Sequence, residues 1–265
     1  TEALKNLLII GGSPQGARPK ALIKFDSTNN RVSTLPTAAG DDWLIKFPAR
    51  GENQSVCAAE HVYAQLAKQC GLNMPDTQFF DLGSGYGAFG VKRFDRDNGM
   101  RIHVHTLAGL LNTNFRLPTL SYTQLLRCIR ALTHSELEVI QGYRQCVFNV
   151  VFHNRDDHSK NFSFMMDSVG NWALSPAYDL SFNTGLNGEH NMDIMGEGKN
   201  IKLKHLLDLA KNSDIKLATA KGIIEHTVSI ASNLNHDLSH YPIDAALREH
   251  ICQHVQKNIN RLKSE

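Results

Sequence analysis

The chain has 265 residues, of which 42% are hydrophobic and 20% are charged. This is the composition of an ordinary globular protein, and the length suits one large domain or two closely packed lobes. Twenty-eight Lys and Arg against 26 Asp and Glu leave a net charge of +2, which gives no general case for nucleic-acid binding, so no direct sequence-specific contact with DNA or RNA is expected.

Cysteine usage and hydropathy disfavour further classes of protein. The five cysteines are odd in number and never form a Cys-x-x-Cys pair, so neither a disulfide framework nor a zinc site is expected, and a reducing cytoplasm is the expected location. No apolar run approaches the roughly 18 residues that span a bilayer, and no signal-peptide pattern opens the chain. We therefore expect no membrane segment.

The front of the chain has the pattern of short strands around one helix. Three apolar-rich segments are strand candidates: Leu4–Ile10, KALIKF and DWLIKF. Helical spacing runs from Val56 to Cys70, and Gly71 stands in the usual helix-terminating position. The segments AFGVKRF and RIHVHTL are expected to form a hairpin, joined by the polar sequence DRDNGM.

Beyond about residue 105 the pattern becomes helical. Thr133 and Glu136 form a Thr-x-x-Glu sequence, which predicts a capping box before the apolar segment LEVIQGYRQCVFNVVF. Four residues of that segment are predicted to share a buried face: Leu137, Ile140, Val147 and Val151. Three further helices are expected: Ile201 to Lys211, Ile215 to Leu234, and Asp244 to Leu262.

Between these helices the sequence predicts a hairpin and a long loop. The segments FSFMM and WALS are its two short strands. Ser181 to Asn200 is rich in Gly and Asn, too polar for the core and long enough for a mobile functional loop. A β-rich lobe (residues 1–97) joined to a helical lobe (residues 98–265) predicts an α+β enzyme with a cleft between them.

A glycine-containing loop, GGSPQGARPK, stands between two predicted strands. Glycines allow backbone N–H groups to approach an anion closely, and Lys20 adds a positive charge that phosphate oxygens would attract. The loop matches neither of the two common nucleotide-binding fingerprints. An ordinary hairpin loop therefore remains an alternative.

Lys46 ends an apolar strand, where its side chain can either extend to solvent or reach into a cleft beside the glycine loop. Glu60, on the helix that follows, could pair with it in the manner of the strand lysine and helix glutamate of kinases. The position of Glu60 next to the apolar stripe permits this pairing without requiring it.

The segment HNRDDHSKN concentrates charge directly after an apolar helix. A solvated turn would explain it alone, but Asp156 and Asn161 have the Asp-x-x-x-x-Asn spacing of kinase catalytic loops. Asp179, in PAYDL, follows a hairpin that returns the chain towards Asn161. An amide and a carboxylate are oxygen ligands that suit Mg²⁺, and Asp156 would then be free to accept a proton from an attacking hydroxyl.

Histidine ligation of a metal is disfavoured, because no third ligand at zinc-like spacing accompanies His153 and His158. A surface loop explains any one of these features well. It explains poorly the kinase-like order of a glycine loop, a strand lysine, an Asp-x-x-x-x-Asn sequence and a later Asp.

At these residues the sequence resembles the HipA family of bacterial serine/threonine kinases, the toxin components of toxin–antitoxin modules. Five segments carry the resemblance, in the order of the family: SPQGARPK, AAEHVYAQLAKQCGLNMPD, VKRFDR, NRDDHSKNFS and PAYDL. The match runs from about Leu8 to Leu180 and, more diffusely, through the C-terminal helices. The resemblance implies a bilobal protein-kinase-like fold that binds ATP and Mg²⁺ between its lobes.

The resemblance also implies roles by motif position. Asp156 would be the catalytic base, with Asn161 and Asp179 as the metal ligands. Ser13 falls at the autophosphorylated serine of the family's glycine loop, where added negative charge would repel nucleotide or eject the loop. The residues implied to bind or flank the nucleotide are Ser13, Gly16, Ala17, Lys20, Lys46, Lys92, Arg93, Phe94, His158, Lys160 and Asp179.

The resemblance implies a protein substrate, with a translation factor or an aminoacyl-tRNA synthetase as examples, and a HipB-like DNA-binding antitoxin as partner. HipA proteins usually carry an extra N-terminal subdomain, whereas here the glycine loop begins almost at once. A shortened chain, a different N-terminal region or a separate protein that supplies the subdomain would each account for this. Two other functions stay open: a small-molecule phosphotransferase and a non-catalytic nucleotide-binding corepressor module.

Overall fold

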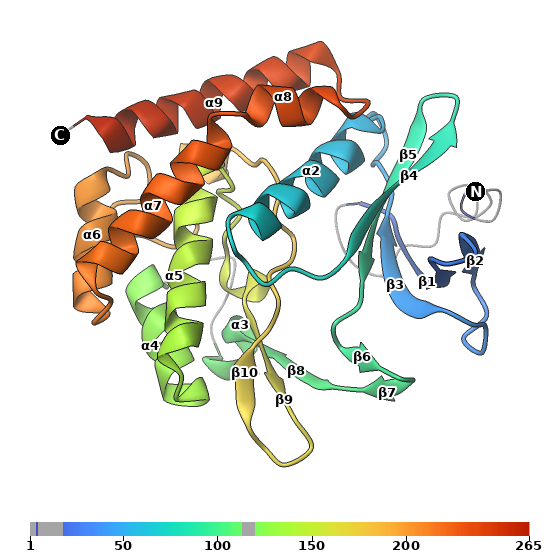
Figure 1. Cartoon of the computed structure of the whole chain (residues 1–265), viewed down its shortest axis with the longest axis horizontal. Helices are drawn as coiled ribbons and strands as arrows, with labels where there is room; N and C mark the ends of the chain where they lie inside the picture. The colour runs from blue at the N-terminus through green and yellow to red at the C-terminus, as the bar shows by residue number, and fades with distance from the viewer. Residues whose placement is uncertain (1–3, 5–17, 113–119, 265) are drawn as a thin grey trace.

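The computed structural model describes Leu4, residues 18–112 and residues 120–264 (Figure 1). Leu4 is buried against the N-terminal sheet, but the rest of the strand predicted over residues 4–10 lies outside the described residues. The same holds for Ser13, Gly16 and Ala17 of the glycine loop. Of that loop, the structure describes Arg18, Pro19 and Lys20.

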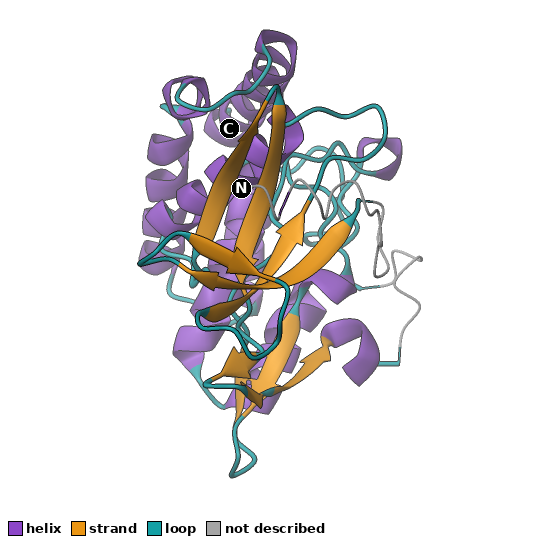
Figure 2. Cartoon of the chain, turned by 90° about the vertical axis from the view of Figure 1, so that its right-hand side faces the viewer, coloured by secondary structure: helices purple, strands orange, loops and turns teal. Residues whose placement is uncertain are grey.

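The N-terminal half is a curled antiparallel sheet with one helix packed against it (Figures 1 and 2). The strand order is β2-β1-β3-β5-β4. The strands are β1 (Lys20–Asp26), β2 (Arg31–Ser33), β3 (Asp41–Lys46), β4 (Thr77–Gly83) and β5 (Tyr86–Lys92). Alternating apolar residues bury one face of the sheet, where the Phe25 ring lies edge-on to Trp43 at 5.1 Å and to Phe80 at 5.2 Å.

Helix α2 (Ser55–Gln69) confirms the predicted helix and contacts β4 and β5. Gly71 follows its C-cap, Cys70, and has a φ of 79°, which favours glycine. The other side of α2 joins the C-terminal half, because Tyr63 Oη donates a hydrogen bond to the Phe152 carbonyl oxygen at 2.8 Å. The apolar residues of α2 therefore belong largely to the main hydrophobic core of the molecule.

The predicted hairpin between AFGVKRF and RIHVHTL was wrong. Strand β5 pairs with β3 and β4, whereas β8 (His103–Thr106) pairs with β9 (Ser163–Met166). The polar sequence between them closes a small hairpin of its own, β6 (Arg96–Asp97) with β7 (Met100–Arg101). Both edges of β5 are already taken by strands of the sheet, so β8 has to find a distant partner.

The C-terminal half is helical and also carries the predicted hairpin of β9 with β10 (Trp172–Leu174), which is confirmed. Its helices are α3 (Leu107–Leu110), α4 (Tyr122–Thr133), α5 (Glu136–Val151), α6 (Leu203–Asn212), α7 (Leu217–Ala231), α8 (Leu234–Ser239) and α9 (Ala245–Lys263). Helix α5 contacts α4, α7 and α9 and forms the centre of the core (Figure 1). None of the described helices has the length and apolarity needed to cross a membrane.

The start of α5 differs from the prediction in two respects. Thr133 is the last residue of α4, and Ser135 is the N-cap of α5, with its Oγ accepting a hydrogen bond from the Glu138 N–H. Two overlapping Ser/Thr-x-x-Glu sequences occur here, and the left-handed His134, with φ of 52°, ends α4 between them. Leu137, placed on the buried face by its spacing, is 77% exposed.

Candidate active site

The strand register brings two lysines together where β1 begins and β3 ends. Lys20 on β1 is the direct cross-strand neighbour of Lys46 on β3, so both side chains leave the same face. Like charges in this position repel each other unless carboxylates compensate for them. Lys46 Nζ lies 2.5 Å from Glu60 Oε1 and 2.5 Å from Asp179 Oδ1. The pairing of Lys46 with Glu60 that the sequence permitted is therefore present.

The ammonium of Lys46 is buried, with only 7% of the residue exposed. Burial alone would lower the pKa of this lysine, but the charges and hydrogen bonds of Glu60 and Asp179 outweigh it and raise the pKa above the usual range. Lys46 is therefore a fixed positive charge at physiological pH.

Asp179 presents its carboxylate at the same point. Desolvation opposes its ionisation, but the charge of Lys46, followed by Lys20 and His158, lowers the pKa of Asp179. Its backbone is in the left-handed region, with φ of 57°, a conformation that is uncommon outside glycine and that gathers at functional sites. The side chain is still 43% exposed, so one face of the carboxylate is accessible to a ligand.

The loop of residues 153–161, called the Asp156 loop below, faces Asp179. Desolvation raises the pKa of Asp156, and the negative charge of Asp179 adds to this rise, against the opposing effect of His158, whose Nε2 lies 3.8 Å from Asp156 Oδ1. Asn161 donates a hydrogen bond from its Nδ2 to the Asp156 backbone oxygen at 2.8 Å, which leaves its amide oxygen as the atom that can ligate a metal. The structure thus brings Asp156, Asn161 and Asp179 to one region.

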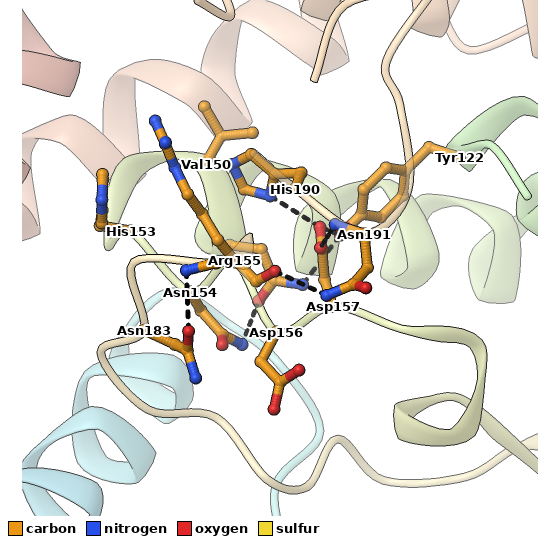
Figure 3. A network of polar contacts seen from close by, with 12 residues as sticks. Tyr122, Val150, His153, Asn154, Arg155, Asp156, Asp157, Asn183, His190 and Asn191 are labelled. Atoms are coloured by element: carbon orange, nitrogen blue, oxygen red, sulfur yellow. Dashed lines mark hydrogen bonds and ion pairs between the residues drawn. The ribbon is translucent and has the colours of Figure 1, made fainter. Parts of the chain in front are cut away.

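Asp157 turns away from this region into the core (Figure 3). It is 1% exposed, and its carboxylate accepts hydrogen bonds from Tyr122 Oη at 2.7 Å and from the Asn191 N–H at 2.8 Å. His190 Nδ1 lies 2.7 Å from the same carboxylate. These contacts fix the backbone on one side of Asp156. Sequence reasoning missed Tyr122 and His190, because each lies more than 30 positions from Asp157 in the chain.

The long segment from Ser181 to Asn200 is anchored by the same network. Met192 is 1% exposed and Ile194 is fully buried, so the expectation that this segment is too polar for the core was wrong. A buried carboxylate needs hydrogen-bond donors, and the segment supplies two of those that hold Asp157.

Two neighbouring cavities share part of their lining, and Lys46 lines the inner one. The inner one, of about 230 Å³, is charged and is lined by Lys20, Lys46, Glu60, Asp179 and apolar residues. The outer one, of about 400 Å³, is mainly apolar, and its lining includes Leu22, Leu44, Val91, Phe94 and Tyr178. Both cavities share Lys20, Leu44, Val91 and Tyr178. An apolar slot that opens onto convergent charges is the usual form of a small-molecule site.

The segment Lys92–Phe94 borders the outer cavity. The Lys92 side chain is directed to Asp41, with an N···O distance of 2.7 Å, and Arg93 forms a two-point contact with Asp95. The backbone N–H groups of Lys92 and Arg93 are also already engaged. Phe94 lies against Tyr178, with 5.6 Å between ring centroids.

Tyr178 was not identified from the sequence. Its hydroxyl donates to the Lys160 backbone oxygen at 2.6 Å and lies 2.6 Å from Ser163 Oγ. The side chain of Lys160 itself is exposed. Tyr178 thus connects the wall of the cavity to the loop that carries Asp156, and its place directly before Asp179 was the only available signal.

The ligand atoms available for a cation are carboxylate and amide oxygens. Within the described ranges no group of three or more His, Cys, Asp or Glu side chains could hold a metal ion. Mg²⁺ needs fewer protein ligands, since it is usually bound through one or two carboxylates together with substrate phosphates and water. The oxygens of Asp179 and Asn161 fit that requirement.

Comparison with known proteins agrees with this architecture. A sequence model of the HipA-like C-terminal domain matches residues 12–234, and the chain belongs to that family. The fold, a curled antiparallel sheet joined to a helical half, is kinase-like. HipA of Shewanella oneidensis, solved with HipB and operator DNA, superposes with a TM-score of 0.71 at 20% identity, over 95% of this chain and 65% of that one. The Helicobacter pylori proinflammatory kinase CtkA gives a TM-score of 0.57 at 15% identity, over 85% and 89% of the two chains.

Two curated relatives carry kinase names. "Putative kinase Y4dM" of Sinorhizobium fredii is 28% identical over 190 residues, which is 62% of this chain and 46% of the relative. A "Putative kinase" of Haemophilus influenzae is 26% identical over 191 residues, 64% of this chain and 52% of the relative. The chain thus spans about half the length of the curated relatives it matches.

Proposed function

We propose that this chain is an ATP- and Mg²⁺-dependent serine/threonine kinase that phosphorylates a cellular protein and itself at Ser13. The observation that carries the proposal is the simultaneous contact of Lys46 with Glu60 and Asp179 at the inner end of an apolar cavity. Phosphoryl transfer asks a protein mainly for alignment and for neutralisation of phosphate charge, and this arrangement offers both.

Each part of the nucleotide has a matching environment. The outer cavity, with Leu44, Val91 and Phe94 among its lining residues, suits the adenine ring. Because the N–H groups of Lys92 and Arg93 are engaged, a backbone contact to the ring is left to Phe94 or to carbonyl groups. Lys20 and Lys46 face the position of the phosphates. Mg²⁺, held by Asp179 and the amide oxygen of Asn161, would neutralise phosphate charge.

Asp156 is the proposed base. Its carboxylate takes the proton of the substrate hydroxyl while that oxygen bonds to the γ-phosphorus, and the bond from the γ-phosphorus to the bridging oxygen of ADP breaks. The raised pKa of Asp156 makes it a stronger base than an exposed aspartate. Lys160 and His158, in the same loop, are proposed to contact the phosphates and the adjacent carboxylates.

The biological setting is proposed from the family. HipA of Shewanella oneidensis was solved with HipB and operator DNA, and we propose a HipB-like DNA-binding antitoxin as the partner of this chain in the cytoplasm. The two lobes, residues 1–97 and 98–265, would close on the nucleotide. A protein of the translation machinery, such as an aminoacyl-tRNA synthetase, is the proposed substrate class.

The test is a comparison of the wild type with Asp156→Asn, both incubated with ATP and Mg²⁺. Intact-mass and peptide mass spectrometry should find one added phosphate at Ser13 in the wild type only. Phosphoproteomics of cells expressing each chain would identify the protein substrate. If the wild type gains no more phosphate than Asp156→Asn, the self-phosphorylation proposal is wrong. Tight ATP binding without turnover would support the non-catalytic module instead.

A further inference from the structure

We propose that a basic cavity behind the Asp156 loop is a binding site for a phosphate group. The cavity, of about 190 Å³, lies between the beginning of that loop, residues 184–200 and helix α9. Its cationic lining residues are Arg155, Lys199, Lys257 and Arg261. The remaining lining residues within the described part of the chain are glycine, Thr, Asn and His, so no carboxylate faces the cavity.

Arg155 carries the deepest of these charges. The residue is only 7% exposed, and Figure 3 shows its side chain directed away from that of Asp156. Its terminal nitrogens donate to the backbone oxygens of Gly188 and Lys199, and its buried Nε has no hydrogen-bond partner. Fully buried arginines are normally paired with an anion. Here backbone carbonyls replace the missing counter-charge, so the cavity keeps its positive character.

Two further charges come from helix α9. Lys257 and Arg261 stand four residues apart, one helical turn, and therefore share the face that meets the cavity. Burial and then the charge of Arg261 lower the pKa of Arg155, and the charges of Asp157 and Glu189 offset this only in part. A phosphate dianion would relieve this repulsion and accept several charge-assisted hydrogen bonds at once.

His153 also lines the cavity but adds no charge. Burial, followed by the repulsion of Arg155, lowers the pKa of His153 to about 3. The ring is therefore neutral at physiological pH. The anion affinity of the cavity thus rests on the Arg and Lys side chains.

A phosphate group could reach this cavity from two sources. One is a free phosphate ion. The other is a phosphorylated Thr184, since Thr184 is one of the lining residues. In that case a kinase would form a bond between Thr184 Oγ1 and the γ-phosphorus of ATP, with release of ADP and of the hydroxyl proton. Both sources present the same group, with a charge of about −1.5 to −2 near neutral pH.

Occupancy of the site would join three parts of the molecule. Arg155 directly precedes Asp156 in the chain. Both Thr184 and Lys199 belong to the segment that holds Asp157. Two further lining residues, Lys257 and Arg261, belong to α9. A bound phosphate would therefore secure the Asp156 loop from the side opposite the nucleotide cavities. The site does not depend on the proposed kinase activity, because its occupancy can be measured without turnover.

The test is a calorimetric titration of the full chain with inorganic phosphate. The double variant Lys257→Gln/Arg261→Gln should bind about tenfold more weakly or worse, since it loses two charge-assisted contacts. The matched control Arg248→Gln/Lys263→Gln removes the same charge from α9 outside the cavity and should bind like the wild type. Arg155 is left intact because its replacement would disturb the fold. Equal affinity in all three chains would overturn the proposal.

A second arm distinguishes the sources. A chain carrying phosphothreonine at position 184 should exclude free phosphate and melt at a higher temperature, and the double variant should lose that gain in melting temperature. If this chain still binds free phosphate as the wild type does, the ion is the ligand and the site stands. If the double variant loses affinity for a DNA duplex but not for phosphate, the cavity binds a nucleic-acid backbone and the proposal is wrong.

Discussion

Lys46 Nζ and Asp179 Oδ1 lie 2.5 Å apart although 133 positions separate the two residues in the chain. The contact joins the N-terminal sheet to the segment after the β9–β10 hairpin. Because Glu60 holds the other side of Lys46, the lysine keeps one carboxylate when the other binds a ligand. The buried lysine would therefore keep one counter-charge if Asp179 bound the proposed cation.

Replacement of Asp179 by asparagine should separate activity from stability. We expect Asp179→Asn to lower ATP-dependent phosphorylation by about two orders of magnitude or more. The free energy of unfolding should change by less than about 1 kcal/mol, since Lys46 retains Glu60. Kinetic assays and urea unfolding would measure the two quantities. Asp76→Asn is the control, because the Asp76 side chain pairs with Lys68 at an exposed position. A variant that unfolds instead of losing activity would contradict this assignment.

The network beneath the loop should contribute measurably to stability. Tyr122→Phe removes one of the hydrogen bonds to buried Asp157 and leaves Asn149 Nδ2 without its acceptor. We expect a loss of about 1–3 kcal/mol in the free energy of unfolding, measured in urea. Tyr86→Phe, at a residue 55% exposed, should change it by less than about 0.5 kcal/mol. Equal stability of the two variants would show that the network adds little.

Two buried histidines should make the protein less stable in mild acid. Burial lowers the pKa of His61 to about 4 and that of His153 to about 3, whereas unfolded histidine titrates near 6.5. Below about pH 6.5 the unfolded chain binds more protons than the folded one, so stability present above that pH is lost as the pH falls towards 4. Unfolding free energies at about pH 7.5 and pH 5 would measure the difference.

The contribution of His61 can be isolated by substitution. His61→Gln should reduce the loss of stability between these two pH values, whatever its effect on stability at neutral pH. The exposed His240 offers the control substitution, His240→Gln, which should leave the difference unchanged. An unaltered pH dependence in His61→Gln would argue against a neutral buried imidazole.

Two helical glycines should respond in opposite directions to alanine. A Cβ at Gly142 in α5 would lie 2.4 Å from Ile129 Cδ1 and 2.9 Å from Leu126 Cδ2, both in the core. We expect Gly142→Ala to cost about 1–3 kcal/mol through overpacking. A Cβ at Gly222 in α7 meets nothing within 4 Å, so Gly222→Ala should stabilise the helix by about 0.5–1 kcal/mol. Chemical denaturation of both variants would reveal whether the signs differ.

Local features of the fold could be predicted because the periodicity of apolar residues and the residues that end a helix are local signals. The spacing of apolar residues predicts α2, and Gly71 marks its end. The partner of β8 could not be predicted, because β9 lies almost 60 positions away in the chain. The amino-acid sequence of β8 does not exclude pairing with β5. Overlapping cap sequences around Ser135 were likewise ambiguous until the conformation of His134 was known.

For the candidate site, the order of the motifs indicated which residues meet but not what supports them. Asp156, Asn161 and Asp179 were singled out by spacing and by resemblance. Tyr122 and His190 have no motif, and their importance follows only from the buried carboxylate of Asp157. The register that sets Lys20 opposite Lys46 depends on the whole β1–β3 pairing and could not be derived from either residue.

Helix α2 carries Glu60, whose carboxylate accepts a hydrogen bond from Lys46. One turn later the same helix carries Tyr63, whose hydroxyl donates a hydrogen bond to the carbonyl oxygen of Phe152, just before the loop that contains Asp156. A single helix thus contacts both the N-terminal sheet and the C-terminal half of the molecule. Because most of α2 is buried between the sheet and the C-terminal helices, any displacement of this helix would disturb the lysine contact and the contact to Phe152 together.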